Sequence, residues 1–249
     1  MLLVLAGSIL TFTLVQEATV VEPFEKGTIV IEQDVDSGPV ELRSDVRVEP
    51  LVAKAVSGMQ RGFLPGRSML QNVVEVDTEM RAARLSEKDP AAIFFDFAAA
   101  SSSLAHDFLH DTLEYLGLPP AFRLFVANLY FGNGSRISAG GELLGGFSLG
   151  ASIRQGCPRS PLLFALTADL LEQCLRRALR EELLQACADD LALVTGDMGN
   201  AAAEFVPLFA DFALISGLEL NLQKTVLVPL GDSEHEAVRM RLAEAFSGW

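Results

Sequence analysis

Apolar positions in the middle of the chain fall either in continuous runs or at helical spacing. The run AAIFF at 91–95 follows a proline and ends at Asp96, which is typical of a buried strand that ends in a carboxylate. Apolar residues three and four apart, bounded by glycine, proline or arginine, predict helices over residues 102–116, 121–131, 161–180 and 201–216. The most regular apolar stripe belongs to the helix over 161–180.

Further strands are predicted where short apolar stretches meet turn residues. Residues 136–153 alternate apolar stretches with glycines, as a β-hairpin does, and LLQACA and LALVT flank Asp189 and Asp190 as two short strands joined by a tight acidic turn. The stretch LELNLQKTVLVPL at 218–230 also predicts strands. Helices and hairpins mix without a strict strand–helix–strand alternation, so the predicted fold class is α+β.

The first 41 residues differ in texture from the rest. They begin with a run that is uncharged as far as Glu17, which is too short for a membrane span and lacks the basic flank of a secretory signal. A signal peptide remains an alternative for this run. Weak strand signals follow it, and a mixed-charge, helical texture begins near Leu42, where we place a boundary. We expect an intracellular protein, in cytoplasm or nucleus, that is not secreted and has no membrane partner.

Composition limits the classes of function. The 249 residues are 50% hydrophobic and 21% charged, as in a folded globular protein of one large or two small domains. The net charge of 19 − 33 = −14 argues against a sequence-independent nucleic-acid binder, because phosphate affinity comes from Lys and Arg. Cys157, Cys174 and Cys187 match neither a zinc pattern nor a disulfide framework, so we expect reduced thiols.

Two adjacent aspartates between apolar strands are the main chemical signal. Desolvating a carboxylate is costly unless it is paired or binds a metal. If the two strand systems are neighbours in one sheet, Asp96, Asp189 and Asp190 converge on an oxygen-rich site for Mg²⁺. Such a site suits two metals that act in phosphoryl transfer. Taken alone, the aspartate pair also fits a solvated hairpin tip.

A second metal signal is weaker. His106 and His110 lie four residues apart and so share a helix face. Zinc needs three or four ligands, and the neighbourhood adds only Asp107 and Asp111. We therefore expect these histidines to be ordinary helix residues.

Five segments, taken in order, resemble the reverse transcriptases of LINE-type (non-long-terminal-repeat) retrotransposons. They are MQRGFLPGRSMLQNVVEVD (59–77), AAIFFDFAAASSSLAHDFL (91–109), IRQGCPRSPLLFAL (153–166), ACADDLALVT (186–195) and SGLELNLQKT (216–225). The resemblance implies a polymerase palm, which is a ferredoxin-like antiparallel sheet with helices on one face, together with partial fingers.

The resemblance also implies a domain organisation and an activity. The expected regions are a divergent N-terminal segment (1–41), partial fingers (42–90), a palm with catalytic carboxylates (91–230) and a C-terminal helix with the thumb absent or truncated (231–249). The implied function is an RNA-directed DNA polymerase with two Mg²⁺ ions, for which Mn²⁺ is a substitute. Its partners would be an RNA template, a DNA primer and deoxynucleoside triphosphates; the oligomeric state stays open.

Site residues follow from the resemblance by position. Asp96, Asp189 and Asp190 match the metal-binding and catalytic acids, of which Asp96 and Asp189 are the firmer ligands. Lys224 matches a lysine near the triphosphate, where a cation could assist the leaving pyrophosphate; an exposed strand lysine is the alternative. The expected nucleotide- or template-binding residues are Arg67, Phe97, Ser101, Gln155 and Gly156.

The chain also departs from the family. Ser101 occupies the bulky position that, in the family, excludes a ribose 2′-hydroxyl, so selection of deoxynucleotides is in doubt. The basic finger segment expected upstream of Gln60 is not found in residues 1–45. These gaps and the acid excess leave two alternatives open. One is a catalytically silent palm remnant that binds metal or a protein partner. The other is an acidic domain without a site, in which Asp96 would lie far from Asp189.

Overall fold

The computed structural model describes residues 52–53, 56–86, 88–130, 134–139, 142–154, 157 and 159–231, with the backbone alone described within 134–146. All of these belong to one compact unit, Arg47–Trp249. The N-terminal segment 1–41, the strands expected in it, the C-terminal helix expected after residue 231, and Gln155 and Gly156 lie outside the described residues.

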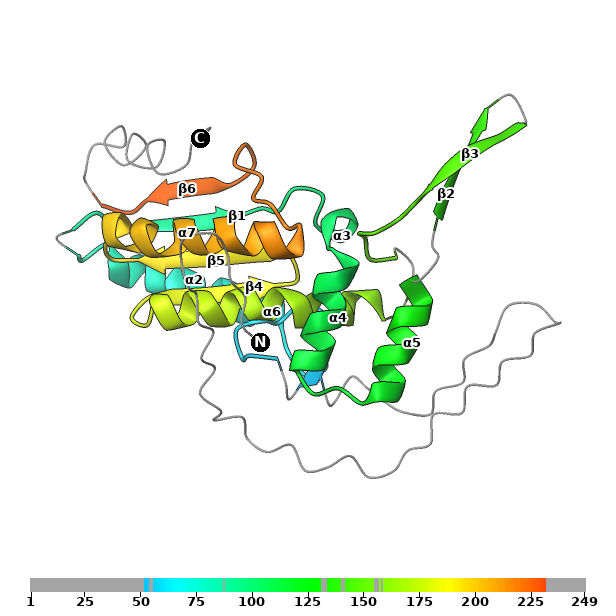
Figure 1. Ribbon diagram of the computed structural model, residues 1–249. Helices are drawn as coiled ribbons and strands as arrows, with labels where there is room; N and C mark the ends of the chain where they lie inside the picture. The colour runs from blue at the N-terminus through cyan, green and yellow to red at the C-terminus, as the bar shows by residue number, and fades with distance from the viewer. Residues whose placement is uncertain are drawn as a thin grey trace. The chain divides into compact units, whose positions relative to one another are not determined.

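A four-stranded antiparallel sheet with the order β4-β5-β1-β6 forms the centre of this unit (Figure 1). Its strands are β1 (Ala91–Phe95), β4 (Leu183–Cys187), β5 (Asp190–Thr195) and β6 (Val226–Pro229). The chain from β1 to β4 forms α3 (Ala100–Ser103), α4 (His106–Tyr115), α5 (Pro120–Tyr130), the hairpin β2 (Gly134–Ala139) and β3 (Glu142–Ser148), and α6 (Ser160–Ala178). Helix α7 (Met198–Ser216) joins β5 to β6. The first strand therefore lies between the last two in chain order, which is the predicted ferredoxin-like arrangement.

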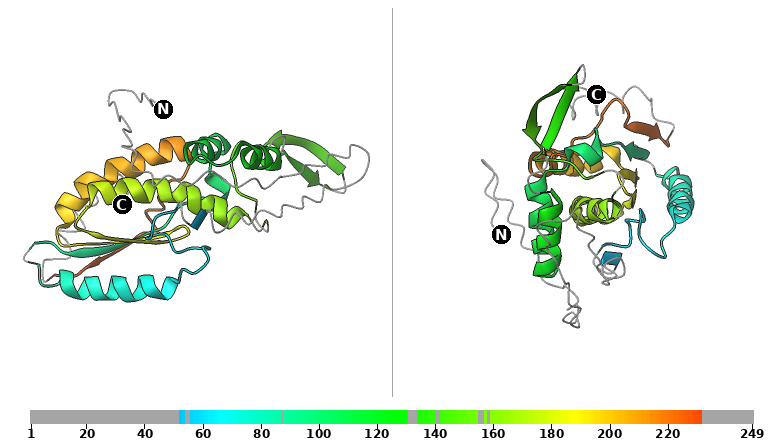
Figure 2. Two further views of the ribbon diagram at one scale, coloured as in Figure 1. Left: turned by 90° about the horizontal axis from the view of Figure 1, so that it is seen from below. Right: turned by 90° about the vertical axis from the view of Figure 1, so that its right-hand side faces the viewer.

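Helices cover both faces of the sheet, and those of the expected palm region lie on one face. Helices α6 and α7 lie on one side and α2 (Met69–Ala83) lies on the other (Figure 2). The strands are apolar on both sides: Phe95 meets the rings of Phe205 and Phe209 of α7 at 5.4 and 4.7 Å between centroids. Ala92, the third residue before Phe95, packs instead with Val76 of α2. The palm helices α6 and α7 therefore share one face of the sheet as predicted, and α2, from the region expected to be fingers, covers the other.

Two elements differ from what their apolar spacing predicts. The helix expected over 102–116 is divided into α3 and α4, because the amide of Ala105 donates to the carbonyl of Ser216 at 2.8 Å and that of His106 to Gly150 at 3.0 Å. In the stretch 218–230 only β6 is a strand. Residues 219–225 instead form a loop around the end of β1, which is important for the site.

Helix α7 is long and apolar enough, by length and composition, to cross a membrane. One face of it packs on the sheet: Phe205 is fully buried, and Phe209 is 4% exposed against β1. The helix begins after its N-cap Asp197 and ends at Gly217, which adopts a left-handed conformation with φ 76°. The predicted stop at Gly217 is confirmed.

Candidate active site

The register of β1 and β5 brings the predicted acids together. Phe95 pairs with Leu191 in an antiparallel ladder, so the next residue on each strand, Asp96 and Asp190, lie opposite each other. Burial raises the pKa of Asp190 above its ordinary value, and the charges of Asp189 and Asp96 raise it further. The alternative in which Asp96 lies far from the acidic turn is therefore wrong.

The donor set of this end of the sheet suits a hard cation. Oδ2 of Asp96 is buried and has no hydrogen-bond partner, and Asp189 and Asp190 are exposed. A carboxylate oxygen that is desolvated and unpaired gains most from a cation, and Mg²⁺ prefers such oxygen ligands. As placed, no three His, Cys, Asp or Glu side chains within the described residues form a group at metal-binding spacing. The acids thus converge without closing into a complete ligand set.

The loop after α7 fixes Asp96 from the backbone side. The amide of Asn221 donates to the carbonyl of Asp96 at 2.7 Å, and the amide of Asp96 donates to Oγ1 of Thr225 at 3.3 Å. The amide of Ala98 adds a bond to the carbonyl of Glu219 at 2.8 Å. Lys224 lies in this loop with an exposed side chain. The loop therefore ties Lys224 to the strand end that carries Asp96, while its contact with a triphosphate stays a prediction.

A cavity of 270 Å³ opens beside Asp189. Ser101 lines it, as do Arg154 and Cys157, which flank the undescribed Gln155 and Gly156. Phe63, which the sequence did not single out, also lines it with 64% of its surface exposed. The remaining lining residues are Ala100, Ile153, Ser160, Pro161, Phe164 and Ala188. Ser101, at the position expected to meet the nucleotide sugar, thus lines the same cavity as Asp189 of the acidic turn.

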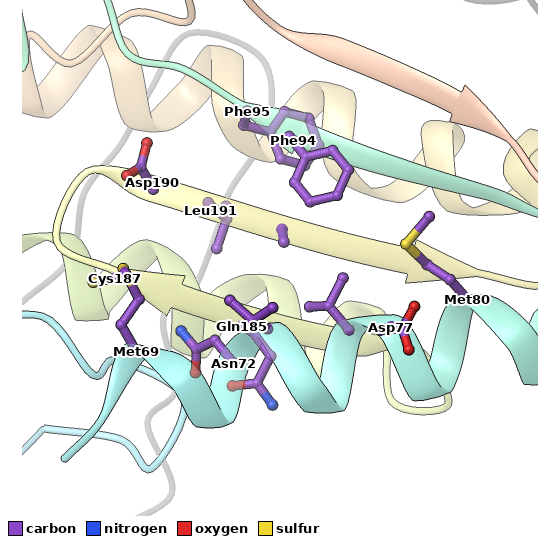
Figure 3. A pocket seen from close by; sticks show the side chains of 13 residues that line it. Met69, Asn72, Asp77, Met80, Phe94, Phe95, Gln185, Cys187, Asp190 and Leu191 are labelled. Carbon is purple, nitrogen blue, oxygen red and sulfur yellow. The ribbon is translucent and has the colours of Figure 1, made fainter.

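A second cavity, of 430 Å³, lies between α2 and the sheet. Figure 3 shows Asp190 at its rim, with Phe94 of β1 and Met69 and Asn72 of α2 around it. Its lining is mainly apolar. The two adjacent aspartates therefore line different hollows, Asp189 the smaller and Asp190 the larger.

Two of the expected nucleotide-binding residues have structural surroundings. The guanidinium of Arg67 donates four hydrogen bonds, to the backbone carbonyls of Ala53, Val56, Ser57 and Gln60. These bonds hold the chain before α2 in a turn. The ring of Phe97 is 8% exposed and lies 6.1 Å from that of Phe209. For both residues a nucleotide contact stays a prediction, and the observed contacts favour a packing role.

The histidine pair has no zinc partner set within the described residues. Nε2 of His106 lies 3.0 Å from the carbonyl oxygen of Ser152, and its ring lies 4.9 Å from that of Tyr130. His106 therefore joins α4 to the segment that leads to the cavity, as an ordinary structural residue.

The sequence did not indicate how the segment just before α2 approaches the acidic turn. Phe63 has φ 58°, an unusual backbone conformation for a residue with a side chain, and nothing in the sequence marks it. Gly62 approaches the acidic turn so closely that a Cβ there would lie 2.2 Å from the amide nitrogen of Ala188. The glycine in the GF pair was the signal that could have indicated a close approach of two backbones.

Comparison with known proteins gives a family for the chain. The profile of the family described as reverse transcriptase (RNA-dependent DNA polymerase) matches residues 43–237. The chain is 29% identical over 193 residues to the Retrovirus-related Pol polyprotein from type-2 retrotransposable element R2DM of Drosophila melanogaster, covering 75% of this chain and 18% of that protein. It is 25% identical over 162 residues to the Transposon TX1 uncharacterized 149 kDa protein of Xenopus laevis, covering 61% and 12%.

The chain thus spans less than a fifth of the length of these curated relatives. Among solved structures, the fold is similar to that of apo telomerase from Candida tropicalis truncated from its C-terminal domain. The TM-score is 0.58 with 12% identity, and the match covers 76% of this chain and 40% of that one. At this identity the likeness concerns the fold alone.

Proposed function

The chain belongs to the reverse transcriptase family, and from this premise we propose that it is the palm and part of the fingers of an RNA-directed DNA polymerase. It would add deoxynucleotides to the 3′ hydroxyl of a DNA primer on an RNA template. The observation that carries the proposal is the pairing of Phe95 with Leu191, which sets Asp96 opposite Asp190 beside Asp189.

Asp96, Asp189 and Asp190 would hold two Mg²⁺ ions, for which Mn²⁺ can substitute. The fit rests on the unpaired, buried Oδ2 of Asp96 and on the charge of its neighbours at Asp190. When bound, the metal pair would activate the primer hydroxyl and neutralise charge on the leaving pyrophosphate. Most of the rate would come from positioning and charge stabilisation, since phosphoryl transfer asks little covalent chemistry of the protein.

The chain's own residues would orient the substrates. The cavity beside Asp189 is the proposed nucleotide site, with Ser101 next to the sugar and Arg154 and Phe63 on its walls. Gln155 and Gly156 are proposed to meet the base pair on the same side. Lys224 would stand near the pyrophosphate, from the loop that holds Asp96. An intracellular location follows for a protein that uses nucleic acid and nucleotides.

The acid excess bears on how the template is held. With a charge of −14, the chain has few cations for phosphate contacts. Its relatives are more than five times longer than the matched part. We infer that tight template binding depends on basic surface outside the part of the family that this chain represents.

Primer extension by the purified chain tests the proposal. The reaction uses an RNA template, Mg²⁺ and either deoxy- or ribonucleotides, beside an Asp189→Asn variant. Extension that the variant loses supports the polymerase, and ribonucleotide use would identify Ser101 as an open sugar position. No extension by folded wild-type protein, at template concentrations that saturate any binding, would contradict the proposal.

A second candidate is a palm remnant that binds metal without polymerising. It is favoured by Ser101 at the cavity wall, where the resemblance expects a bulky side chain. Mn²⁺ binding that depends on Asp96 and Asp189, without any extension, would be its signature.

A further inference from the structure

The acidic turn is bound from the protein interior by a single buried side-chain amide. The side chain of Gln60 is fully buried. Its Oε1 accepts hydrogen bonds from the amides of Gly62 at 2.8 Å and Ala188 at 2.7 Å. Its Nε2 donates to the carbonyl of Ala188 at 3.1 Å and to Oε1 of Glu172 at 2.7 Å. All four hydrogen-bonding positions of the amide are therefore used.

This pattern admits only one orientation and one residue type. A flipped amide would set Oε1 against the carbonyl of Ala188 and Nε2 against two N–H donors. Glutamate at position 60 could accept both amide hydrogens but, when ionised, could not donate to the Ala188 carbonyl. Leucine fills a similar volume and leaves the same backbone groups unpaired in the interior.

Ala188 is the residue that most needs such support. It has φ 61°, a left-handed conformation that is unfavourable with a Cβ, and it directly precedes Asp189. A conformation of this kind persists when its surroundings fix it more than once. Gln60 binds both the N–H and the C=O of Ala188, and Gly62 packs against the same nitrogen closely enough to exclude a side chain.

We propose that Gln60 is a positioning residue that fixes the Ala188–Asp189 turn and so keeps the carboxylate of Asp189 within reach of the metal ions that Asp96 shares. The role rests on the proposed polymerase function. It also makes the segment before α2, expected to belong to the fingers, part of the support of the palm acids. A nucleotide that contacts Phe63, three residues after Gln60, would meet the same segment.

Glu172 completes the support from the opposite side. It lies in α6 with 2% of its surface exposed, and its Oε1 fixes the orientation of the Gln60 amide. Burial raises its pKa well above the ordinary value, and the charge of Asp169 adds to this, against opposing effects of Gln60 and Arg67. A raised pKa favours the neutral form of the acid, which beside a neutral amide needs no counter-ion.

The test compares four variants of the full chain: Gln60→Leu, Gln60→Glu, Glu172→Gln and Leu166→Ala. Leu166 is 1% exposed in the same helix as Glu172, so its truncation gives a general loss of stability. Three quantities are measured: hydrogen exchange of the Gly62 and Ala188 amides, Mn²⁺ affinity, and kcat and KM of primer extension.

We expect Gln60→Leu to expose both amides to exchange and to lower kcat more than it raises the nucleotide KM. It should also weaken Mn²⁺ binding by about tenfold, which is the effect of losing a buried hydrogen bond to the turn. Gln60→Glu, which keeps the two acceptor bonds and the shape, should fall between Gln60→Leu and wild type. Glu172→Gln keeps an acceptor for Nε2 of Gln60 and should resemble wild type. Leu166→Ala should lose stability and keep its Mn²⁺ affinity.

The outcomes separate this role from the polymerase itself. Wild type that neither binds Mn²⁺ nor extends a primer would contradict the proposed function, while amide exchange in Gln60→Glu would still test the support of the turn. Wild-type Mn²⁺ affinity in Gln60→Leu, or a loss no larger than that of Leu166→Ala, would overturn the positioning role. If Gln60→Leu does not fold, Gln60→Glu decides by the same criteria.

Discussion

Two groups of acidic side chains in this protein differ in burial and in the hydrogen-bond donors that surround them. The site acids, Asp96, Asp189 and Asp190, stand where β1 and β5 meet, half-buried or exposed. The buried acids, Asp169 and Glu172, lie in α6 with 2% of each exposed. The pKa values of Asp190, Asp169 and Glu172 are all raised, but of these three acids only the two in α6 accept hydrogen bonds within the described residues.

The donors make the difference. Oδ1 of Asp169 accepts from the amide of Ser57 at 2.9 Å and its Oδ2 from Gln173 at 2.7 Å, while Gln60 donates to Glu172. In contrast, the pKa of Asp190 is raised by burial and by the charges of Asp189 and Asp96, with no cation among the causes. A group of acids left without donors is unfavourable until a cation arrives. The buried acids hold structure, whereas no cation offsets the charges that act on Asp190.

The largest effect should come from the site acids. Asp96→Asn is expected to lower primer extension by at least about a hundredfold, the cost of losing one preorganised charge in a site of this kind. The free energy of unfolding should not fall, because the carboxylate oxygen Oδ2 of Asp96 accepts no hydrogen bond and its charge raises the pKa of Asp190. Asp107→Asn, at the exposed start of α4, is the control for a general charge effect. Normal extension by Asp96→Asn would mean that Asp96 does not belong with the site acids.

The next effect concerns the contact between the segment before α2 and the acidic turn. Gly62→Ala is expected to reduce the free energy of unfolding by about 2 kcal/mol, because the new Cβ would overlap the backbone of Ala188. Gly58→Ala is the matched control: its Cβ would meet nothing within 4 Å, so its effect should stay below about 0.5 kcal/mol. Urea unfolding of both variants measures the difference. Equal stabilities would mean that the turn does not depend on this contact.

Local patterns of burial account for most of the fold that could be predicted from the sequence. The apolar run 91–95, the hairpin around Asp189 and the stripe of 161–180 each predicted an element that the structure contains. Their periodicity follows from burial, which the sequence encodes locally. The division between α3 and α4 was missed because a distant carbonyl, that of Ser216, takes the Ala105 amide.

The site was predictable where chemistry is unusual and was missed where support is ordinary. Acids between apolar strands are costly, so they stand out in a sequence. Gln60 does not, because its role depends on the left-handed backbone of Ala188, a residue whose identity gives no sign of a positive φ. The sequence also did not place α2, in the expected fingers region, on the other face of the sheet, because strands that are apolar on both faces do not say which helix covers which face.

A pH-dependent effect should distinguish the buried acids. With Glu172 buried, its folded-state pKa lies well above the ordinary 4.5. The unfolded chain releases this proton near 4.5 while the folded chain keeps it, so wild-type stability falls as the pH rises from there to the folded pKa. Asp169 beside it acts in the same direction, and Arg67 opposes it.

Glu172→Gln should remove that loss while keeping an acceptor for Gln60. Its advantage in stability over wild type should be near zero at about pH 4 and grow above that, by about 1.4 kcal/mol for each unit of raised pKa. Urea unfolding at several pH values measures it, with wild type and variant in the same buffers. An advantage that is the same at every pH would mean that Glu172 has no raised pKa in the folded chain.

The smallest expected change in stability compares two partners of one carboxylate, a backbone amide and a side-chain cation. Asp197, the N-cap of α7, accepts from the amide of Asn200 at 3.2 Å and pairs with Lys88 at 2.9 Å. Asp197→Ala should cost about 1 kcal/mol of unfolding free energy through the lost cap. Lys88→Ala should leave the urea midpoint unchanged, because the ammonium is exposed and an exposed ion pair stabilises little. If Lys88→Ala lowers the midpoint as far as Asp197→Ala does, the ion pair and not the backbone amide stabilises this acid. Hydrogen-bond donors would then not be what distinguishes the structural acids from the site acids.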